Sequence, residues 1–374
     1  MNLSYPAART VAPMLEEYFA CHQEEASKRA AGPVAPLPDV QSIEAVLDAA
    51  FWTSLRREEG YETRISLAIL PPEKAQDPML FERLLPLDPA ALTRLAPAVE
   101  RPGIHLGVWR AQAGAVPAFE EGALSVWGTT RGIPFLCFVV EVAAPGLLVI
   151  KHHNGEETRK FINVAVLEGD QVKMVDEHIA ERPDSPRLLK SLLQFNSPGS
   201  ERLALVTLVR LATSMREHRR GGTLLIVPAE RDSWRTSILQ PMKYAVTPFG
   251  QLAAFASGVN CPAIAAIGGL TAVDGATVLN NRYELLGFGA KIVRLLGSPA
   301  VEQVVLSEPI RGATPAVVHP DQLGGTRHLS AAQFVHDQRD SVALVASQDG
   351  RFTVFEWSPA DSIVHAHRID TLLL

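Results

Sequence analysis

Cysteine is scarce in this chain of 374 residues, which contains only Cys21, Cys137 and Cys261. An odd number of widely separated cysteines does not form a disulfide framework, and their spacing matches no metal-binding pattern. We therefore expect reduced, buried thiols in a cytoplasmic protein.

Long hydrophobic runs and an excess of one charge sign are also missing. No apolar run approaches the roughly 20 residues of a membrane span, and residues 1–9 do not begin the basic and apolar pattern of a signal peptide. The formal net charge is -6, which argues against a general affinity for nucleic acids or anionic membranes. These absences predict a protein with neither a nucleic-acid nor a membrane partner.

Apolar residues are plentiful, at 47% of the chain against 20% that are charged. At this length two hydrophobic cores are expected rather than one. Polar, proline-containing stretches at 181–186 and 196–200 separate two regions with different patterns. We therefore predict an N-terminal domain at 1–185 and a C-terminal domain at 186–374.

The N-terminal region is predicted to be a strand-rich α+β domain. Apolar residues at helical spacing predict helices at 12–29 and 42–57, the second with Ser42 as its N-cap. The predicted strands are 63–70, 104–109, 124–127, 135–141, 147–151 and 161–167.

The C-terminal region alternates helices with apolar strands, which is typical of an α/β fold with flanking helices. A hairpin is expected across Asn280-Asn281, because both residues tolerate positive φ. The predicted helices are 203–218, 249–258 and one that starts at Thr326. The predicted strands are 223–227, 270–279, 283–288, 341–347 and 352–357.

Asp274 lies within the apolar segment 273–278 and is followed by Gly275. A carboxylate inside a buried strand costs free energy unless it is paired or holds a cation. Glycine has no side chain, so a ligand can approach its backbone closely. The motif indicates a metal-binding carboxylate beside a ligand, and an ordinary Asp-Gly bend in an edge strand is the alternative.

Gly325, Thr326, Arg327 and His328 precede a predicted helix. Thr326 is expected to cap this helix, whose free N–H groups would face an anion. Arg327 has a planar fork that matches two phosphate oxygens, and His328 can donate a hydrogen bond beside it. The motif predicts a phosphate site, and a capped surface helix with two exposed side chains is the alternative.

In this order, the two motifs resemble the hallmarks of the diadenylate cyclase (DAC) domain, which are Asp-Gly-Ala and a downstream Gly-Thr-Arg-His-Arg. Two further segments strengthen the resemblance. Residues 219–227 look like that family's helix-to-strand entry, and residues 340–347 look like its late strand, followed by a turn and a glycine. The resemblance covers the C-terminal region.

This resemblance implies a mixed sheet flanked by helices that condenses two ATP molecules into cyclic di-AMP with a divalent metal, Mg²⁺ or Mn²⁺. Asp274 would hold the metal and help to activate the ribose 3′-hydroxyl. Because one domain holds one ATP and the product needs two, it also implies a homo-oligomer with face-to-face DAC domains. The implied catalytic residues are Asp274, Arg327 and His328. The implied nucleotide-binding residues are Gly275, Ala276, Gly325, Thr326, Arg327 and His328.

Two positions depart from the family pattern. Leu329 stands where the family has a second arginine, and Gln348 stands where it usually has an acidic residue. Both changes remove groups that serve turnover more than binding. The first alternative to a cyclase is therefore a degenerate DAC domain that binds a nucleotide without turnover. The second is an assembly scaffold with no ligand.

The N-terminal region resembles, more loosely, the sensor domains of the DACNV kind that precede some DAC domains. The resemblance lies in Leu124–Thr130 and Lys160–Val164. It implies that the N-terminal region regulates the C-terminal one. Membrane helices at the start and DNA-binding helices after Leu374, known from other architectures of the family, are not expected.

A second metal candidate comes from histidine. His365 and His367 are two positions apart, which places both on one face of a strand. No third ligand can be named from the sequence, so hydrogen-bonded histidines are the preferred interpretation.

Overall fold

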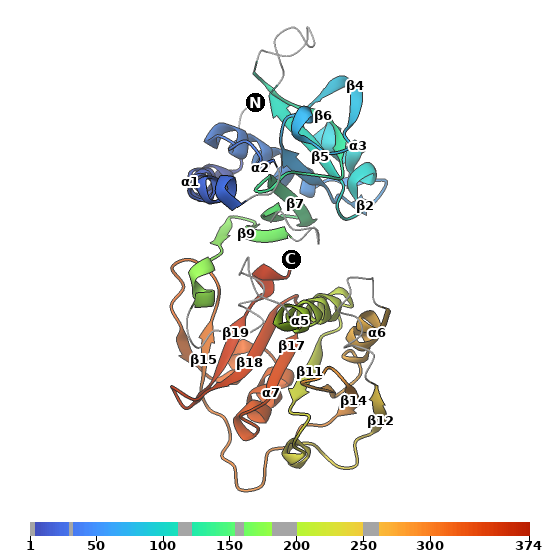
Figure 1. The fold of residues 1–374 in the computed structure, drawn as a ribbon, viewed down its shortest axis with the longest axis vertical. Helices are drawn as coiled ribbons and strands as arrows, with labels where there is room; N and C mark the ends of the chain where they lie inside the picture. Colours follow the sequence, from blue (N-terminus) through green and yellow to red (C-terminus); the bar gives the residue numbers. More distant parts are fainter. Residues whose placement is uncertain (1–3, 30–32, 111–121, 154–160, 182–199, 250–261) are drawn as a thin grey trace. The chain divides into compact units, whose positions relative to one another are not determined.

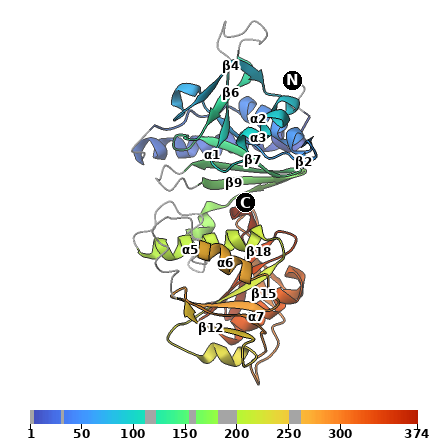
Figure 2. The same cartoon turned by 90° about the vertical axis from the view of Figure 1, so that its right-hand side faces the viewer.

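The computed structural model describes residues 4–29, 33–110, 122–153, 161–181, 200–249 and 262–374. Its contacts divide the chain into unit 1, residues 1–175 with Leu374, and unit 2, residues 176–373. The division after residue 185 that the sequence predicts lies outside the described residues. Each unit is described by itself (Figures 1 and 2).

Capping residues set where two helices of unit 1 begin. Asp39 accepts a hydrogen bond from the Ser42 backbone N–H at 2.8 Å and caps the second helix. The predicted N-cap at Ser42 is therefore wrong, because an aspartate three residues earlier satisfies the free donor. Asp88 caps the third helix, with Pro89 at its first position. The helices are α1 (Pro6–Arg29), α2 (Val40–Ser54) and α3 (Pro89–Val99).

An eight-stranded sheet forms the centre of unit 1. Its strands are β3 (Ser66–Ile69), β4 (Met79–Pro86), β5 (His105–Arg110), β6 (Leu124–Thr130), β7 (Phe138–Ala144), β8 (Leu147–His153), β9 (Phe161–Glu168) and β10 (Gln171–Met174). They are ordered β10-β9-β8-β7-β3-β5-β6-β4, and β3 runs parallel to β5. A separate hairpin pairs β1 (Arg57–Glu58) with β2 (Tyr61–Glu62). Each strand predicted for this region is present, whereas the mostly exposed β4 gives no apolar pattern to predict it.

The two faces of this sheet bury different clusters, because side chains alternate along a strand. Leu67 and Ile69 of β3 pack into the core that includes the three helices. Ala68 projects from the opposite face and packs in a smaller cluster with Trp127. The indole N–H of Trp127 donates a hydrogen bond to the Leu70 carbonyl at 2.8 Å, which fixes the ring against the sheet.

Unit 2 is built on a nine-stranded mixed sheet. Its strands are β11 (Gly222–Val227), β12 (Tyr244–Phe249), β13 (Ala276–Asn280), β14 (Leu285–Ala290), β15 (Val304–Ser307), β16 (Ala316–Val318), β17 (Val342–Ala346), β18 (Phe352–Ser358) and β19 (Ile363–Arg368). They are ordered β12-β14-β13-β11-β17-β18-β19-β15-β16. The pairs β11/β13 and β15/β19 are parallel and the remaining neighbours are antiparallel.

Three described helices flank this sheet, so a mixed α/β architecture with flanking helices is confirmed. Phe334 of the last helix packs with Leu225 and Phe355 in a core on one face. The three helices are α5 (Ser200–Glu217), α6 (Pro262–Leu270) and α7 (Thr326–Asp337). Helices α5 and α6 pack against each other (Figure 1).

The predicted hairpin is confirmed as β13–β14, but its positive φ falls at Tyr283 and not at Asn280 or Asn281. Two predicted boundaries in unit 2 are wrong. The strand predicted from residue 270 begins only at Ala276, because α6 continues to Leu270 and a turn follows. The helix predicted at 249–258 begins at a residue that ends β12, and its remaining residues lie outside the described ones. No described helix is long and apolar enough to cross a membrane.

Gly107 of β5 leaves room for the ring of Trp127, since a Cβ at this position would lie 1.9 Å from Cζ2. We predict that Gly107→Ala lowers the free energy of unfolding by about 1–3 kcal/mol, because the indole must move from its place against Leu70. Urea denaturation of the full chain, followed by circular dichroism, measures the loss. Gly269→Ala is the control, because its added methyl group meets no heavy atom within 4 Å. Equal losses in the two variants would contradict this explanation.

Candidate functional site

The candidate site lies at one edge of the unit 2 sheet, where β11 and β13 begin and β17 ends. Gly222 pairs with Ala346, and Thr223 pairs with Ala276. The turns that lead into β11 and β13 therefore lie beside the turn that follows β17. The sequence resemblance rests on four segments, and this register brings together three of them: 219–227, 274–276 and 340–347.

The fourth segment reaches the same edge through the start of α7. A Cβ on Gly221 would lie 3.0 Å from Arg327 Nη1, 3.3 Å from the Ala346 carbonyl oxygen and 3.4 Å from Gln348 Cγ. The Arg327 guanidinium therefore lies beside Gly221, in the turn before β11, and the turn after β17 lies beside the same glycine. Gln348 donates from Nε2 to the Arg220 carbonyl at 3.4 Å, which links these two turns.

Asp274 lies in the turn between α6 and β13, and its side chain is exposed. The expectation of a buried carboxylate inside a strand is wrong. Turn hydrogen bonds from the backbone N–H groups of Thr271, Ala272 and Val273 to residues 267–270 delay the start of β13. An exposed carboxylate stays solvated, so it needs no cation to offset a burial cost. It remains accessible to a ligand.

The backbone at position 275 has a conformation, and a neighbouring strand so close, that only glycine fits. Its φ is +104°, and a Cβ would lie 2.5 Å from the Gly289 carbonyl carbon and 2.9 Å from the Ala290 nitrogen. The missing side chain therefore makes room for β14. Ala276 follows with only 1% exposure and its methyl group in the core on the α7 face, so a nucleotide at this point would meet its backbone rather than its side chain.

The start of α7 differs from the sequence prediction. Gly325, with φ -76° and ψ -163°, is the N-cap, and no side chain in the described chain caps the helix. Thr326 is instead the first helical residue and is exposed. The predicted Thr326 cap is wrong. Without a side-chain cap, first-turn N–H groups remain able to bind an anion.

His328 is buried, with 2% of its surface exposed, so the alternative of two exposed side chains is wrong. Its ring meets Phe355 edge-on at a centroid distance of 6.0 Å, and Gly324 makes room for it, because a Cβ there would lie 2.4 Å from Nδ1. Burial, followed by the charge of Arg368, lowers the pKa of His328 to about 4. The imidazole is therefore neutral near pH 7.

Three buried polar atoms near this ring have no hydrogen-bond partner among the described residues. They are His328 Nε2, Thr353 Oγ1 and Arg368 Nε. Thr353 pairs with Arg368 across β18 and β19, and it is two residues from Phe355 on the same strand face. A buried polar group without a partner costs about 1–3 kcal/mol. Phosphate oxygens or ordered water would satisfy these atoms.

Four arginines lie around this edge, and two of them are already paired. Arg351 pairs with Asp349 at 3.4 Å, and Arg368 pairs with Glu308 at 2.6 Å. Arg220 and Arg327 are the cations that suit a polyphosphate ligand, with Asp274 as the nearby carboxylate. Within the described part of the chain, no group of three histidine, cysteine, aspartate or glutamate side chains could hold a metal. A divalent ion at Asp274 would therefore take most of its ligands from substrate phosphates and water, as Mg²⁺ commonly does.

Several residues of this edge are not evident from the sequence. His218 and Thr271 join two of its turns, and Thr353 and Arg368 come from the last strands of the sheet. His218 stands in a basic run at the end of α5, which predicts only a favourable helix end. The pairing of β18 with β19 brings Thr353 and Arg368 to this edge, and no local sequence pattern predicts that pairing.

His365 and His367 share one strand face. His367 Nδ1 lies 2.7 Å from the Ser307 hydroxyl oxygen, within hydrogen-bond distance. His365 Nε2 lies 2.8 Å from Asp361 Oδ2 in the turn between β18 and β19, an ion-pair distance without a hydrogen bond. Among the described residues, these histidines belong to no group of three possible metal ligands.

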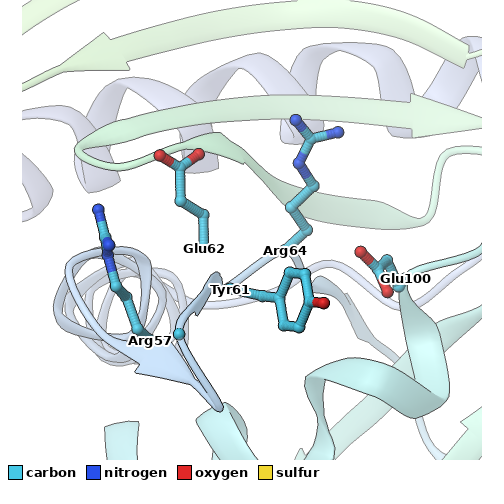
Figure 3. A pocket seen from close by; sticks show the side chains of 6 residues that line it. Arg57, Tyr61, Glu62, Arg64 and Glu100 are labelled. Atoms are coloured by element: carbon cyan, nitrogen blue, oxygen red, sulfur yellow. The ribbon is translucent and has the colours of Figure 1, made fainter.

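Unit 1 has an open hollow of about 370 Å³ beside the β1–β2 hairpin. Figure 3 shows Glu62 between Arg57 and Arg64, with the Tyr61 ring toward Glu100. All five side chains are exposed, and the two arginines are balanced by two glutamates. This chemistry selects no ligand class.

Gly275 and Gly297 form a matched pair for testing the packing of the first motif. Both have positive φ, +104° and +84°, but Gly297 has no heavy atom within 4 Å of an added Cβ. We predict that Gly297→Ala costs about 1–2 kcal/mol from backbone strain alone. Gly275→Ala should cost about 1–3 kcal/mol more, because its methyl group collides with β14. Chemical denaturation measures both, and equal costs would show that the contact with β14 is not limiting.

Comparison with known proteins gives one finding, and it concerns unit 1. Residues 32–131 match the family model described as "Probable sensor domain DACNV", a domain associated with diadenylate cyclases. The match includes Leu124–Thr130, whereas Lys160–Val164 lies beyond it. No model of a DAC catalytic domain matched, and no curated protein matched. The chain therefore contains a region similar to the DACNV sensor domain, which indicates a sensor-regulated signalling protein.

Proposed function

We propose that this chain is a diadenylate cyclase regulated by its N-terminal unit. The observation that supports this best is the convergence of four separate segments at one edge of the unit 2 sheet. Arg327 lies beside Gly221 there, Gln348 lies beside the same glycine, and the turn with Asp274 follows in the neighbouring strand pair. The sensor-domain match of residues 32–131 supports the regulatory part.

In this proposal the start of α7 binds the triphosphate. The Arg327 guanidinium presents a planar pair of donors to phosphate oxygens, and the uncapped N–H groups of the first turn face the same anion. His328, neutral and buried, donates from Nε2, which lacks a partner among the described residues. Phosphoryl transfer depends on such positioning and charge neutralisation more than on covalent help.

Asp274 would hold a divalent ion, Mg²⁺ or Mn²⁺, which supplies charge neutralisation at the phosphates. Its exposed carboxylate would also help to take the proton of a ribose 3′-hydroxyl. The 3′-oxygen then forms a bond to the α-phosphorus of the facing ATP, and the bond from that phosphorus to the β-phosphate bridging oxygen breaks. Two such steps release two pyrophosphates and yield cyclic di-AMP.

The reaction requires two nucleotides to face each other, so two copies of unit 2 must meet. A contact in which each copy presents the same surface has two-fold symmetry. Each 3′-hydroxyl is then directed at the neighbour's α-phosphate. The proposed active form is therefore a homo-oligomer with paired nucleotide sites.

A nucleotide-binding domain without turnover is the second candidate function, and two observations favour it. Leu329, in the first turn of α7, is apolar and 38% exposed, so it adds no second cation at the start of this helix. Gln348 uses its amide to bond the Arg220 carbonyl, so it adds no carboxylate to the site. Both residues leave the phosphate-binding groups in place.

The decisive experiment is incubation of the full-length protein with ATP and Mg²⁺ or Mn²⁺, followed by mass analysis of the products. We expect cyclic di-AMP from the wild type and none from Asp274→Asn. Arg327→Ala should weaken binding of a non-hydrolysable ATP analogue by about 1.5–3 kcal/mol, the range for a charge-assisted hydrogen bond. Calorimetry measures this loss.

The controls are Asp232→Asn and Arg231→Ala, because both side chains are exposed and form surface ion pairs away from this edge. Both should retain wild-type product formation and binding. Wild-type turnover in Asp274→Asn would refute the role of this carboxylate. Arg327-dependent binding without any product would favour the non-catalytic alternative.

Leu329→Arg tests whether the missing arginine limits turnover. We expect the substitution to raise the rate of product formation, because the exposed position at the start of α7 would direct a second cation toward the phosphates. Leu329→Gln is the control, since it adds polarity without charge. A lower rate in Leu329→Arg than in Leu329→Gln would mean that the pocket requires an apolar residue.

A further inference from the structure

His218 follows the last residue of α5 and bonds to both turns that precede the parallel strands β11 and β13. The Arg220 backbone N–H lies 3.1 Å from His218 Nδ1. Because a backbone N–H can only donate, Nδ1 must be the acceptor, and the ring proton is on Nε2. His218 Nε2 lies 3.1 Å from Thr271 Oγ1 and donates to it, and the Thr271 hydroxyl donates to the Gly268 carbonyl at 2.6 Å.

The two turns touch at this point. A Cβ on Gly222 would lie 2.6 Å from Thr271 Oγ1 and 2.7 Å from the Thr271 carbonyl oxygen. One turn contains Gly221, against which Arg327 packs, and the other contains Asp274. The His218–Thr271 hydrogen bond therefore links the turn on the Arg327 side of the site to the turn that contains Asp274.

We propose that His218 is a positioning residue of the nucleotide site, which in its neutral form holds the Asp274 turn in register with the Arg327 side. This inference rests on the proposed function for its effect on nucleotides. The hydrogen bonds themselves do not depend on that function. They require one ring nitrogen to accept and the other to donate, which only a neutral imidazole can do.

Protonation would break this arrangement, because an N–H at Nδ1 would face the Arg220 N–H. Arg220 in the same turn and Arg327 on α7 surround the ring with positive charge. The α6 side presents only the Thr271 hydroxyl and the Gly268 carbonyl, and α6 contains no charged residue. Partial burial, then Arg220, and more weakly Arg327 lower the pKa of His218, and they outweigh the backbone carbonyls of His218 and Gly268, which raise it.

The lowered pKa of His218 makes the stability of the folded chain depend on pH. The folded chain favours neutral His218 more than the unfolded chain does. The stabilisation is therefore fully present above the ordinary histidine pKa of about 6.5 and is lost as pH falls through the lower folded-state value. Nucleotide binding should weaken over the same range.

The test uses the full chain with His218→Ala, Thr271→Val and the double substitution. We expect each single change to weaken binding of a non-hydrolysable ATP analogue at pH 7.5 by roughly three- to tenfold, the effect of one hydrogen bond. The loss in the double variant should be smaller than the sum of the two single losses, since the shared hydrogen bond is removed only once. His319→Ala, an exposed histidine, is the control and should bind as the wild type does.

Calorimetry between pH 5 and pH 8 gives a reading that a merely structural role would not change. As the pH decreases, the affinity of the wild type should fall more steeply than that of His218→Ala. Titration of the nucleotide itself affects both proteins equally, so the difference between them reports on His218. NMR titration of the His218 ring should give a midpoint below the ordinary value. Parallel pH profiles, or a midpoint at or above that value, would overturn the proposal.

Unfolding experiments separate this inference from the proposed function. The two substitutions should be non-additive in urea denaturation whether or not a nucleotide binds. If no protein binds a nucleotide but the non-additivity is present, the proposed function fails and the link between the turns stands. Additive effects would overturn the link itself.

Discussion

The parallel pairing of β11 with β13 is the constraint on which the candidate site depends. Thr223 pairs with Ala276, so the turns before both strands must lie side by side at one sheet edge. Gly222 permits this approach, because any side chain there would collide with Thr271. Once the two turns are in contact, β17 on the other side of β11 adds its own turn. Arg327 then completes the group from α7. Chemistry that needs residues far apart in the sequence can occur here because of this pairing.

Burial divides the charged and polar groups of the site into two kinds. Asp274 is exposed and solvated, so it can meet a metal or a hydroxyl without a prior desolvation cost. His328 is buried and kept neutral, first by burial and then by the charge of Arg368. Its Nε2 has no partner in the described structure. In the proposed site, the exposed Asp274 carboxylate would act at the metal and the ribose hydroxyl, and the buried His328 imidazole would bind the phosphates. The two environments differ as these two roles require.

The two units contribute different functions to the proposal. Residues 32–131 in unit 1 match a sensor-domain family, and the sheet edge of unit 2 contains the groups proposed to bind a nucleotide. Unit 1 builds its core from three helices on an antiparallel-rich sheet, and its hollow near Tyr61 has balanced charges. The chemistry of unit 1 therefore names no signal, while that of unit 2 points to a polyphosphate. Regulation would have to act on the arrangement of turns at the unit 2 edge.

The sequence by itself determined many of the element types, the mixed α/β class and the four segments that converge at the sheet edge. Periodicity and turn residues are local properties, and they predicted the β13–β14 hairpin and most strands of unit 1. Only the tertiary structure decided that Asp274 is exposed, that Gly325 rather than Thr326 caps α7, and that His328 is buried. Exposure and capping depend on where a turn ends and what packs over it. Those outcomes follow from pairings between segments distant in the chain, and no local pattern encodes them.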